Sequence, residues 1–203
     1  MIAVPTCPLK AAEILEKPLT GRPTPPAPGD VVLVRGSGLI PWLIRLFSWG
    51  WWRGEARTRW NHVGIVEGPL GCGVSVIEST WPKVRRRMLA GVEADAEEIA
   101  VWRYSKLGEI QQGKLVMKAR QYLGRRYPWW AVAAHAADGL LGGAYLFRRL
   151  IPDQGRYGIC SWLVAYAYDE CAGVRFLGMP PDRCQPDDIG DCVEASPDWV
   201  RVG

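Results

Sequence analysis

Short runs of apolar residues, each the length of a strand, recur along the chain after residue 29. They lie at 31–34, 63–66, 74–77 and 98–104. The segment 67–73 between the second and third runs is rich in glycine and proline, so we expect it to be the turn of a β-hairpin.

Helical spacing takes over later in the chain. Residues 114–123 carry Leu115, Ala119 and Tyr122 on one face, and Gly124 follows as a stop. Residues 159–171 predict a second helix ending at Gly173, and 186–189 indicate a helix start. Strands and helices are mixed and a hairpin is expected, so the predicted class is α+β, with a mostly antiparallel sheet packed against helices.

Two longer apolar stretches need a separate reading. Residues 39–52 are too few to span a bilayer and include Arg45, and residues 128–147 are interrupted by His135 and Asp138. We expect both to form core or groove-lining helices, and we expect no transmembrane segment.

The chain divides into a proline-rich N-terminal arm, residues 1–28, and one domain, residues 29–203. A length of 203 residues with 48% hydrophobic content suits a single sizeable core. A net charge of +4 is too small for a nucleic-acid binder that relies on charge. The basic cluster 83–87 is expected to be a solvated loop or to face an anionic substrate or partner.

Cysteine usage and the first residues bear on the compartment. The six cysteines form no CxxC pair and no metal-ligand spacing, although a disulfide between Cys184 and Cys192 is conceivable. Residues 1–8 lack the basic and apolar regions of a signal peptide. We therefore expect synthesis in a cytoplasm with reduced thiols.

A trio of residues carries the candidate chemistry. His62 opens one apolar run, Glu78 closes the next, and Cys160 stands at the start of the helix 159–171. If the hairpin residue numbers sum to about 140, His62 lies directly opposite Glu78, within reach of a hydrogen bond. A helix N-terminus stabilises a thiolate, and its free amides could help to form an oxyanion hole. This is the set of a nucleophile, its base and the group that orients the base.

Each residue of the trio also has a structural interpretation. A cysteine on a helix is more often a small buried residue, His62 could satisfy hydrogen bonds at a strand end, and Glu78 could cap a loop. The combination and its flanking residues favour catalysis.

Those flanks resemble a known family. His-Val-Gly-Ile-Val at 62–66 follows a Gly-Asp-Val-Val strand, Val-Ile-Glu ends at 78, and Cys-Ser-x-Leu-Val starts at 160. Leu-Gly-x-x-Tyr ends at 127, and Gln-Pro-Asp-Asp stands at 185–188. This pattern, over about residues 29–195, is similar to the circularly permuted NlpC/P60 proteins of the papain-like superfamily, of the YiiX/YaeF type. Their order along the chain is histidine, polar residue, cysteine.

The resemblance implies a papain-like, permuted NlpC/P60 fold and assigns roles. Cys160 would be the nucleophile, His62 the base and Glu78 the orienting group, with no cofactor or metal required. Two departures stand out, because the family often has Ser where this chain has Asn61, and Tyr-Asp where this chain has Tyr127-Pro128. The further candidates for substrate binding are Tyr127, Trp60, Asn61, Trp52 and Ser161.

The function expected from this resemblance is a cysteine hydrolase that cleaves an amide through a thioester, with peptidoglycan peptide as the preferred substrate. Without a signal, such an enzyme would reach the wall as a phage-tail, virion-associated or lysis protein, and the arm 1–28 could contact phage tail proteins. The alternatives are a lipid or acyl ester/amide hydrolase or acyltransferase, and a catalytically silent structural module of an assembly.

Overall fold

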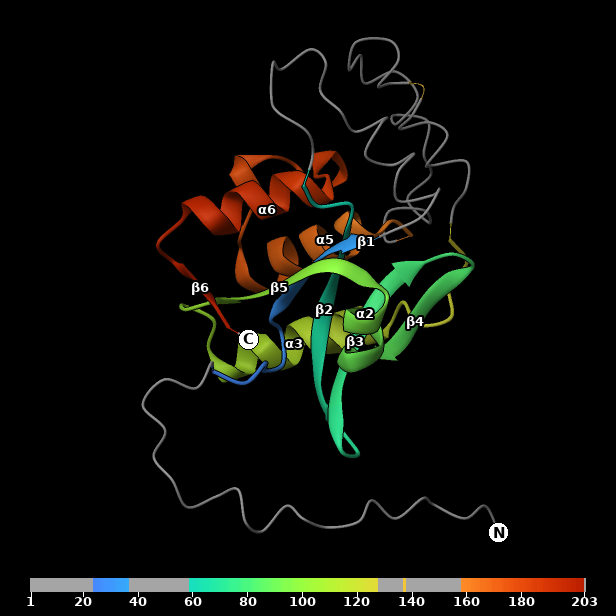
Figure 1. The fold of residues 1–203 in the computed structure, drawn as a ribbon. Coiled ribbons are helices and arrows are strands. Elements are labelled where there is room, and N and C mark those ends of the chain that lie inside the picture. The colour runs from blue at the N-terminus through green and yellow to red at the C-terminus, as the bar shows by residue number, and fades with distance from the viewer. Residues whose placement is uncertain (1–23, 37–58, 128–136, 138–157, 203) are drawn as a thin grey trace, which may run out of the picture.

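The computed structural model describes residues 24–36, 59–127, 137 and 158–202. These residues form a six-stranded sheet in the order β4-β3-β2-β1-β5-β6, with every neighbouring pair antiparallel (Figure 1). The strands are β1 (Val31–Gly36), β2 (His62–Leu70), β3 (Gly73–Thr80), β4 (Lys83–Met88), β5 (Ala96–Tyr104) and β6 (Trp199–Arg201).

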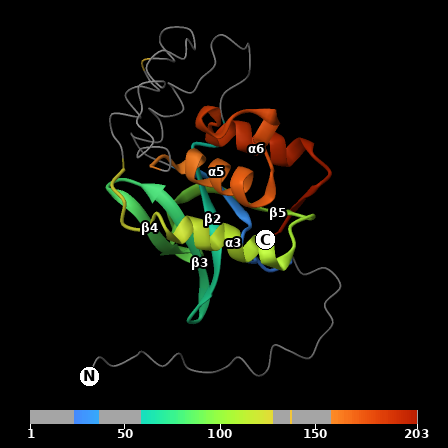
Figure 2. The same cartoon turned by 180° about the vertical axis from the view of Figure 1, so that it is seen from behind.

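Helices pack against both faces of this sheet. They are α2 (Leu89–Ala94), α3 (Glu109–Arg120), α5 (Cys160–Ala172) and α6 (Pro186–Ala195), with two 3₁₀ turns, η4 (Phe176–Gly178) and η5 (Pro181–Arg183). Helices α3 and α5 lie across one face and α2 lies on the other (Figures 1 and 2). The predicted α+β class, with an antiparallel sheet packed against helices, is confirmed. None of the helices in the described ranges is long and apolar enough to cross a bilayer.

The alternation of side chains along the strands divides the core into two clusters. Val31 and Leu33 of β1 point into the larger cluster, between the sheet and helices α3 and α5. Val32 and Val34 point the other way, into a smaller cluster that includes residues of α2. Both faces of β1 are therefore buried, which explains its unbroken apolar run.

The predicted helices are present, with shifted ends. Helix α3 begins five residues before the predicted start and ends at Arg120, and Gly124 takes a positive φ of 83° in the turn that follows. Helix α5 ends at Gly173, in the left-handed conformation with φ 67°, as its position predicts. Helix α6 begins at Pro186 as expected.

The hairpin between β2 and β3 is confirmed, but its expected turn, 67–73, is wrong in extent. The strands continue through that segment, and only two residues, 71 and 72, turn the chain. A bulge between Val66 and Gly68 leaves Glu67 without a partner in the strand register, and Gly68 beside it has a φ of 126°. Glu67 within the bulge is buried because Arg86, Arg120 and Ser75 bind its carboxylate.

The basic cluster 83–87 is not a loop, because its residues form most of the edge strand β4. Val84 points into the large core cluster, whereas Arg85 and Arg87 lie on the opposite face of the sheet. Period-two alternation within a charged run was the signal for this strand. Cys184 and Cys192 are free thiols, so the conceivable disulfide between them is absent. Residues 1–23 of the arm, the apolar stretch 39–52 and the apolar stretch 128–147 apart from residue 137 fall outside the described ranges.

Candidate active site

His62 and Glu78 meet across β2 and β3, although not in the predicted register. Glu78 pairs with Gly64, so the paired numbers sum to 142 rather than 140. A shift of two residues keeps both side chains on the same face, and the imidazole reaches the carboxylate diagonally. His62 Nε2 donates a hydrogen bond of 2.9 Å to Glu78 Oε2. The predicted contact is therefore confirmed and the predicted register is wrong.

Gly64 provides the space for this diagonal contact. A Cβ on Gly64 would lie 2.9 Å from Val76 Cγ1, 3.1 Å from the Ile77 carbonyl oxygen and 3.5 Å from Glu78 Cβ. The first distance is shorter than real Cβ contacts, so a side chain here would force its neighbours to move. The glycine of the His-x-Gly sequence thus has a packing role directly opposite Glu78.

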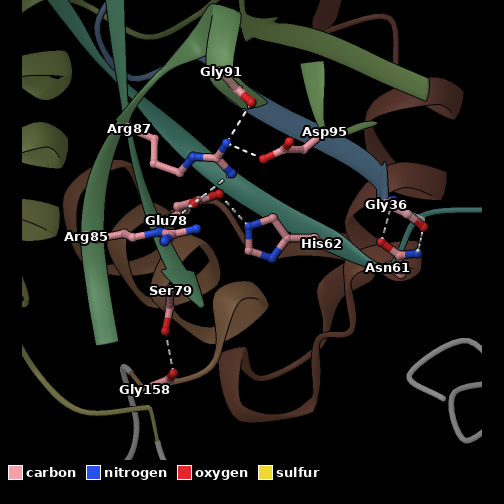
Figure 3. A network of polar contacts seen from close by, with 10 residues as sticks. All are labelled: Gly36, Asn61, His62, Glu78, Ser79, Arg85, Arg87, Gly91, Asp95 and Gly158. Atoms are coloured by element: carbon pink, nitrogen blue, oxygen red, sulfur yellow. Dashed lines mark hydrogen bonds and ion pairs between the residues drawn. The ribbon is translucent and has the colours of Figure 1, made fainter. Parts of the chain in front are cut away.

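Two arginines of β4 hold the carboxylate of Glu78 from the other side (Figure 3). Arg85 pairs with Glu78 in the strand register and donates from Nε to Oε1 at 3.2 Å. Arg87 approaches the same oxygen at 3.6 Å and is itself held by the carbonyl of Gly91 and by Asp95, at 2.6 and 2.5 Å. One carboxylate oxygen therefore serves the imidazole and the other serves the guanidinium groups.

Cys160 is the first residue of α5, after an extended residue at 159 with φ −99° and ψ 145°. The first amides of a helix have no intrahelical acceptor, so those of Cys160 and Ser161 are directed to stabilise negative charge at the helix start. Ser79, which follows Glu78, donates to the carbonyl of Gly158 just before the helix. This bond ties the start of α5 to the strand that carries Glu78.

The electrostatics of the trio favour a protonated imidazole. Burial disfavours the charged form of His62, but hydrogen bonding and charge from Cys160 and Glu78 outweigh it and raise the pKa of His62 to about 10. Burial would raise the pKa of Glu78, yet the hydrogen bond to His62 and the charges of His62, Arg87 and Arg85 lower it to about 2. Because Nε2 serves Glu78, Nδ1 is the ring nitrogen left to exchange a proton with the thiol. The structure thus brings the three predicted residues together.

Tyr127 also belongs to this neighbourhood. Burial and the nearby charge of Cys160 raise the pKa of its phenol, which therefore stays protonated at neutral pH. Its backbone amide donates to the carbonyl of Pro82 at 2.9 Å, which holds residue 127 against the turn between β3 and β4. The phenol can act as a hydrogen-bond donor close to the thiol.

Two other candidates, Trp60 and Asn61, have structural contacts. The Trp60 indole is buried, donates to Glu194 at 3.2 Å and packs so closely on α6 that a Cβ on Gly190 would lie 2.2 Å from the ring. The Asn61 amide group exchanges two hydrogen bonds with the backbone of Gly36 (Figure 3). Both residues fix the start of β2, and contact between them and a substrate stays a prediction.

The remaining two candidates for substrate binding are Ser161 and Trp52. Ser161 is buried in the first turn of α5, directly after the thiol. Trp52 lies outside the described residues.

Sequence reasoning missed the arginines on Glu78 and the bond from Ser79. Arg85 and Arg87 are two residues apart, seven and nine residues after Glu78. Read as a strand returning antiparallel to β3, that spacing would have placed both guanidinium groups beside the carboxylate. This spacing is the signal that could have found them, and the expected solvated loop is wrong because these residues form β4.

The described residues do not fit a metal site. They contain no group of three or more His, Cys, Asp or Glu side chains placed to hold a metal ion. The Glu78 carboxylate, which would be the natural ligand beside His62, already faces an imidazole and two guanidinium groups. A further cation there would meet like charge.

Comparisons with known proteins place the fold. No family model matches the chain, and no curated protein matches it in sequence. Among solved structures, the fold is similar to that of the metalloprotein YiiX from Escherichia coli O157:H7, a DUF1105 protein. The TM-score is 0.59 at 18% sequence identity, and the match covers 88% of this chain and 97% of YiiX. The chain therefore has a YiiX-like α+β fold.

Proposed function

We propose that this protein is a cysteine hydrolase of the permuted NlpC/P60 type, which cleaves an amide through a thioester on Cys160. The observation that carries the proposal is the His62–Glu78 hydrogen bond of 2.9 Å beside a thiol at a helix N-terminus. A nucleophile, a base and an orienting carboxylate in contact are what thiol acyl transfer requires.

In the proposed first step, the Cys160 thiolate attacks the carbonyl carbon of the substrate and a C–S bond forms. The oxygen takes up negative charge and is stabilised by the first amides of α5 and by the Tyr127 hydroxyl. The C–N bond then breaks as the proton of His62 passes to the leaving nitrogen. The products of this step are a thioester, a free amine and a neutral imidazole.

In the second step, water attacks the thioester and gives a proton to His62. The C–S bond breaks, a carboxylic acid leaves, and the imidazolium and the thiolate are restored. Throughout, Glu78 accepts a hydrogen bond from Nε2 and so keeps Nδ1 directed at the reaction. Although burial would raise the pKa of Glu78, the hydrogen bond and charge of His62, together with the charges of Arg87 and Arg85, hold it low, so Glu78 orients and stabilises the imidazolium without taking its proton.

The preferred substrate is a peptidoglycan peptide, and the competing class is a lipid or acyl ester. The test is incubation with purified muropeptides and, separately, with phospholipid vesicles, using wild type and Cys160→Ala. Release of peptide fragments by the wild type alone supports the peptidase. Release of fatty acid alone moves the protein to the lipid class, and cleavage of neither substrate refutes both versions.

A further inference from the structure

Arg85 and Arg87 differ in how fully their hydrogen-bond donors are used. Arg87 is held by Glu78, the carbonyl of Gly91 and Asp95, and its side chain is 23% exposed. Arg85 uses one N–H, from Nε to Glu78, and makes no other hydrogen bond or ion pair within the part of the chain that the structure describes. Its side chain is 40% exposed. A guanidinium has five N–H donors, so four of those on Arg85 have no acceptor among the described residues and could serve a ligand.

The available donors lie next to the reacting groups. Glu78 separates Arg85 from His62 by the width of one carboxylate, since Oε1 accepts from Arg85 and Oε2 from His62. Figure 3 shows the Arg85 side chain extending from β4 along the face of the sheet toward the imidazole. His62 passes its proton to the leaving group in the proposed mechanism. The leaving part of the substrate therefore lies on the His62 side of the thiol, and Arg85 lies beyond the imidazole on that side, behind Glu78.

The charge around Arg85 also favours an anion. Protonated His62, Arg85 and Arg87 face the carboxylates of Glu78 and Asp95, and the imidazolium also faces the Cys160 thiolate of the proposed mechanism. Asp95 is 71% exposed and lies at the far side of Arg87, so it does little to neutralise Arg85. Arg85 therefore shares its one carboxylate with His62 and Arg87 and keeps part of its positive charge, on a planar fork whose geometry matches a carboxylate or a phosphate.

We propose that Arg85 is a specificity-determining residue that binds an oxyanion, carboxylate or phosphate, on the leaving-group part of the substrate. The proposal rests on the proposed acyl-transfer function and narrows the class of substrate. Substrates would be amides or esters whose leaving amine or alcohol carries a negative charge close to the scissile bond. A carboxylate belongs to an amino-acid leaving group, whereas a phosphate belongs to a phosphorylated amino alcohol.

The kinetic test compares leaving groups of similar size and different charge. N-acylglycine and N-acylglycinamide carry the same acyl group and differ in one carboxylate, and N-acyl-O-phosphoethanolamine supplies the phosphate. The wild type is expected to prefer the charged substrates over the neutral amide by about tenfold or more in kcat/KM, the effect of one charge-assisted contact. The ratio of kcat/KM between the carboxylate substrate and the phosphate substrate then shows which oxyanion Arg85 prefers.

Arg85→Gln and Arg87→Gln form a matched pair for this test. Both remove a guanidinium from Glu78, so both are expected to slow all substrates. Arg85→Gln is expected to bring the preference for charged substrates close to one, whereas Arg87→Gln keeps it. Because the preference is a ratio within one variant, loss of folded protein cancels. Equal rates for charged and neutral substrates in the wild type, or an unchanged preference in Arg85→Gln, would overturn the proposal.

A binding measurement separates this inference from the proposed function. The chain has two histidines, His62 and His135, so the imidazole NMR signals of a Cys160→Ala protein are simple to assign. N-acylglycine is expected to shift the His62 signals saturably, and the additional change Arg85→Gln is expected to abolish saturation. Saturable binding through Arg85 without hydrolysis of any substrate would refute the proposed function and retain the anion site. Hydrolysis by the wild type without saturable binding of N-acylglycine would retain the proposed function and refute the anion site on Arg85.

Discussion

Glu78→Gln removes the negative charge from the centre of the site and keeps the shape of the side chain. In the wild type the pKa of His62 is raised from 6.5 to about 10, in part by the hydrogen bond to Glu78. A hydrogen bond to a charged group contributes about 1.5–3 kcal/mol. At 1.36 kcal/mol per pKa unit, its loss lowers the pKa of His62 by about 1–2 units. Arg85, left without a counter-charge, and Arg87, left with only the exposed Asp95, push the pKa in the same direction.

The assay is an NMR titration of the His62 imidazole in wild type and Glu78→Gln, with acylation of Cys160 measured in parallel. The expected titration midpoint falls from about 10 to about 8–9, and the acylation rate falls about 10–100-fold, the kinetic equivalent of the lost bond. A pKa of His62 that stays near 10 in Glu78→Gln would refute the role of Glu78 in holding the proton on His62.

Glu67→Gln is the matched control. Glu67 is also a buried carboxylate with a pKa lowered to about 2, because Arg86, Arg120 and Ser75 outweigh the effect of burial. Removing one partner of a buried charge pair costs about 3–5 kcal/mol, so both variants are expected to lose stability. Only Glu78→Gln is expected to change the titration of His62, which separates the site effect from general destabilisation.

The pair also predicts how stability depends on pH. The pKa of Glu78 is lowered from 4.5 to about 2, so its contribution is complete above pH 4.5 and is lost as the pH falls through 2. The pKa of His62 is raised from 6.5 to about 10, so its contribution is complete below pH 6.5 and is lost as the pH rises through 10. The difference in Tm between wild type and Glu78→Gln is therefore expected to be largest between about pH 4.5 and 6.5. A difference that is constant with pH would contradict the charge pairing.

Three further outcomes are expected. Gly64→Ala places a Cβ 2.9 Å from Val76 and is expected to cost about 1–3 kcal/mol of stability, measured by urea unfolding, and to slow acylation; unchanged stability would show that the contact relaxes freely. Tyr127→Phe is expected to lower kcat about 10-fold or more with little change in KM, because it removes an oxyanion donor; a change in KM alone would assign it to binding instead. Burial raises the pKa of Cys184 to about 12, so iodoacetamide in excess at pH 7 is expected to modify Cys160 and exposed Cys72 while sparing Cys184, as read by peptide mass mapping.

Local signals predicted much of the fold. Apolar runs marked β1, β2, β3 and β5, Gly173 marked the end of α5, and Gly124 lies in the turn that follows α3. The pattern failed where burial came from ion pairs rather than apolar residues. Strand β4 is a charged run, and the segment around Glu67 resembles a turn in sequence but is held extended by arginines from β4 and α3. Such pairs join residues distant in sequence, so no local window contains them.

The three residues of the trio could be predicted from the sequence, but the strand register that joins two of them could not. Strand periodicity placed His62 and Glu78 on the same face of the hairpin and close together. The helix start at Cys160 followed from the helical spacing after it. The difference in register comes from the position of the turn. Next to it the paired residue numbers sum to 143, and the bulge lowers the sum to 142 at Gly64 and Glu78, against the expected 140. The arginines on Glu78 required β4 to be recognised as a strand.

The central claim is that Cys160 becomes acylated with the help of His62 and Glu78. The most direct measurement is intact-protein mass spectrometry after mixing with an activated acyl ester, in a Cys72→Ser background, because Cys72 is the exposed thiol among the described residues. The account predicts one acyl adduct that hydroxylamine removes, mapped to Cys160, absent in Cys160→Ala and formed much more slowly in His62→Ala. An adduct that forms equally fast in His62→Ala, or no adduct on Cys160, would contradict it.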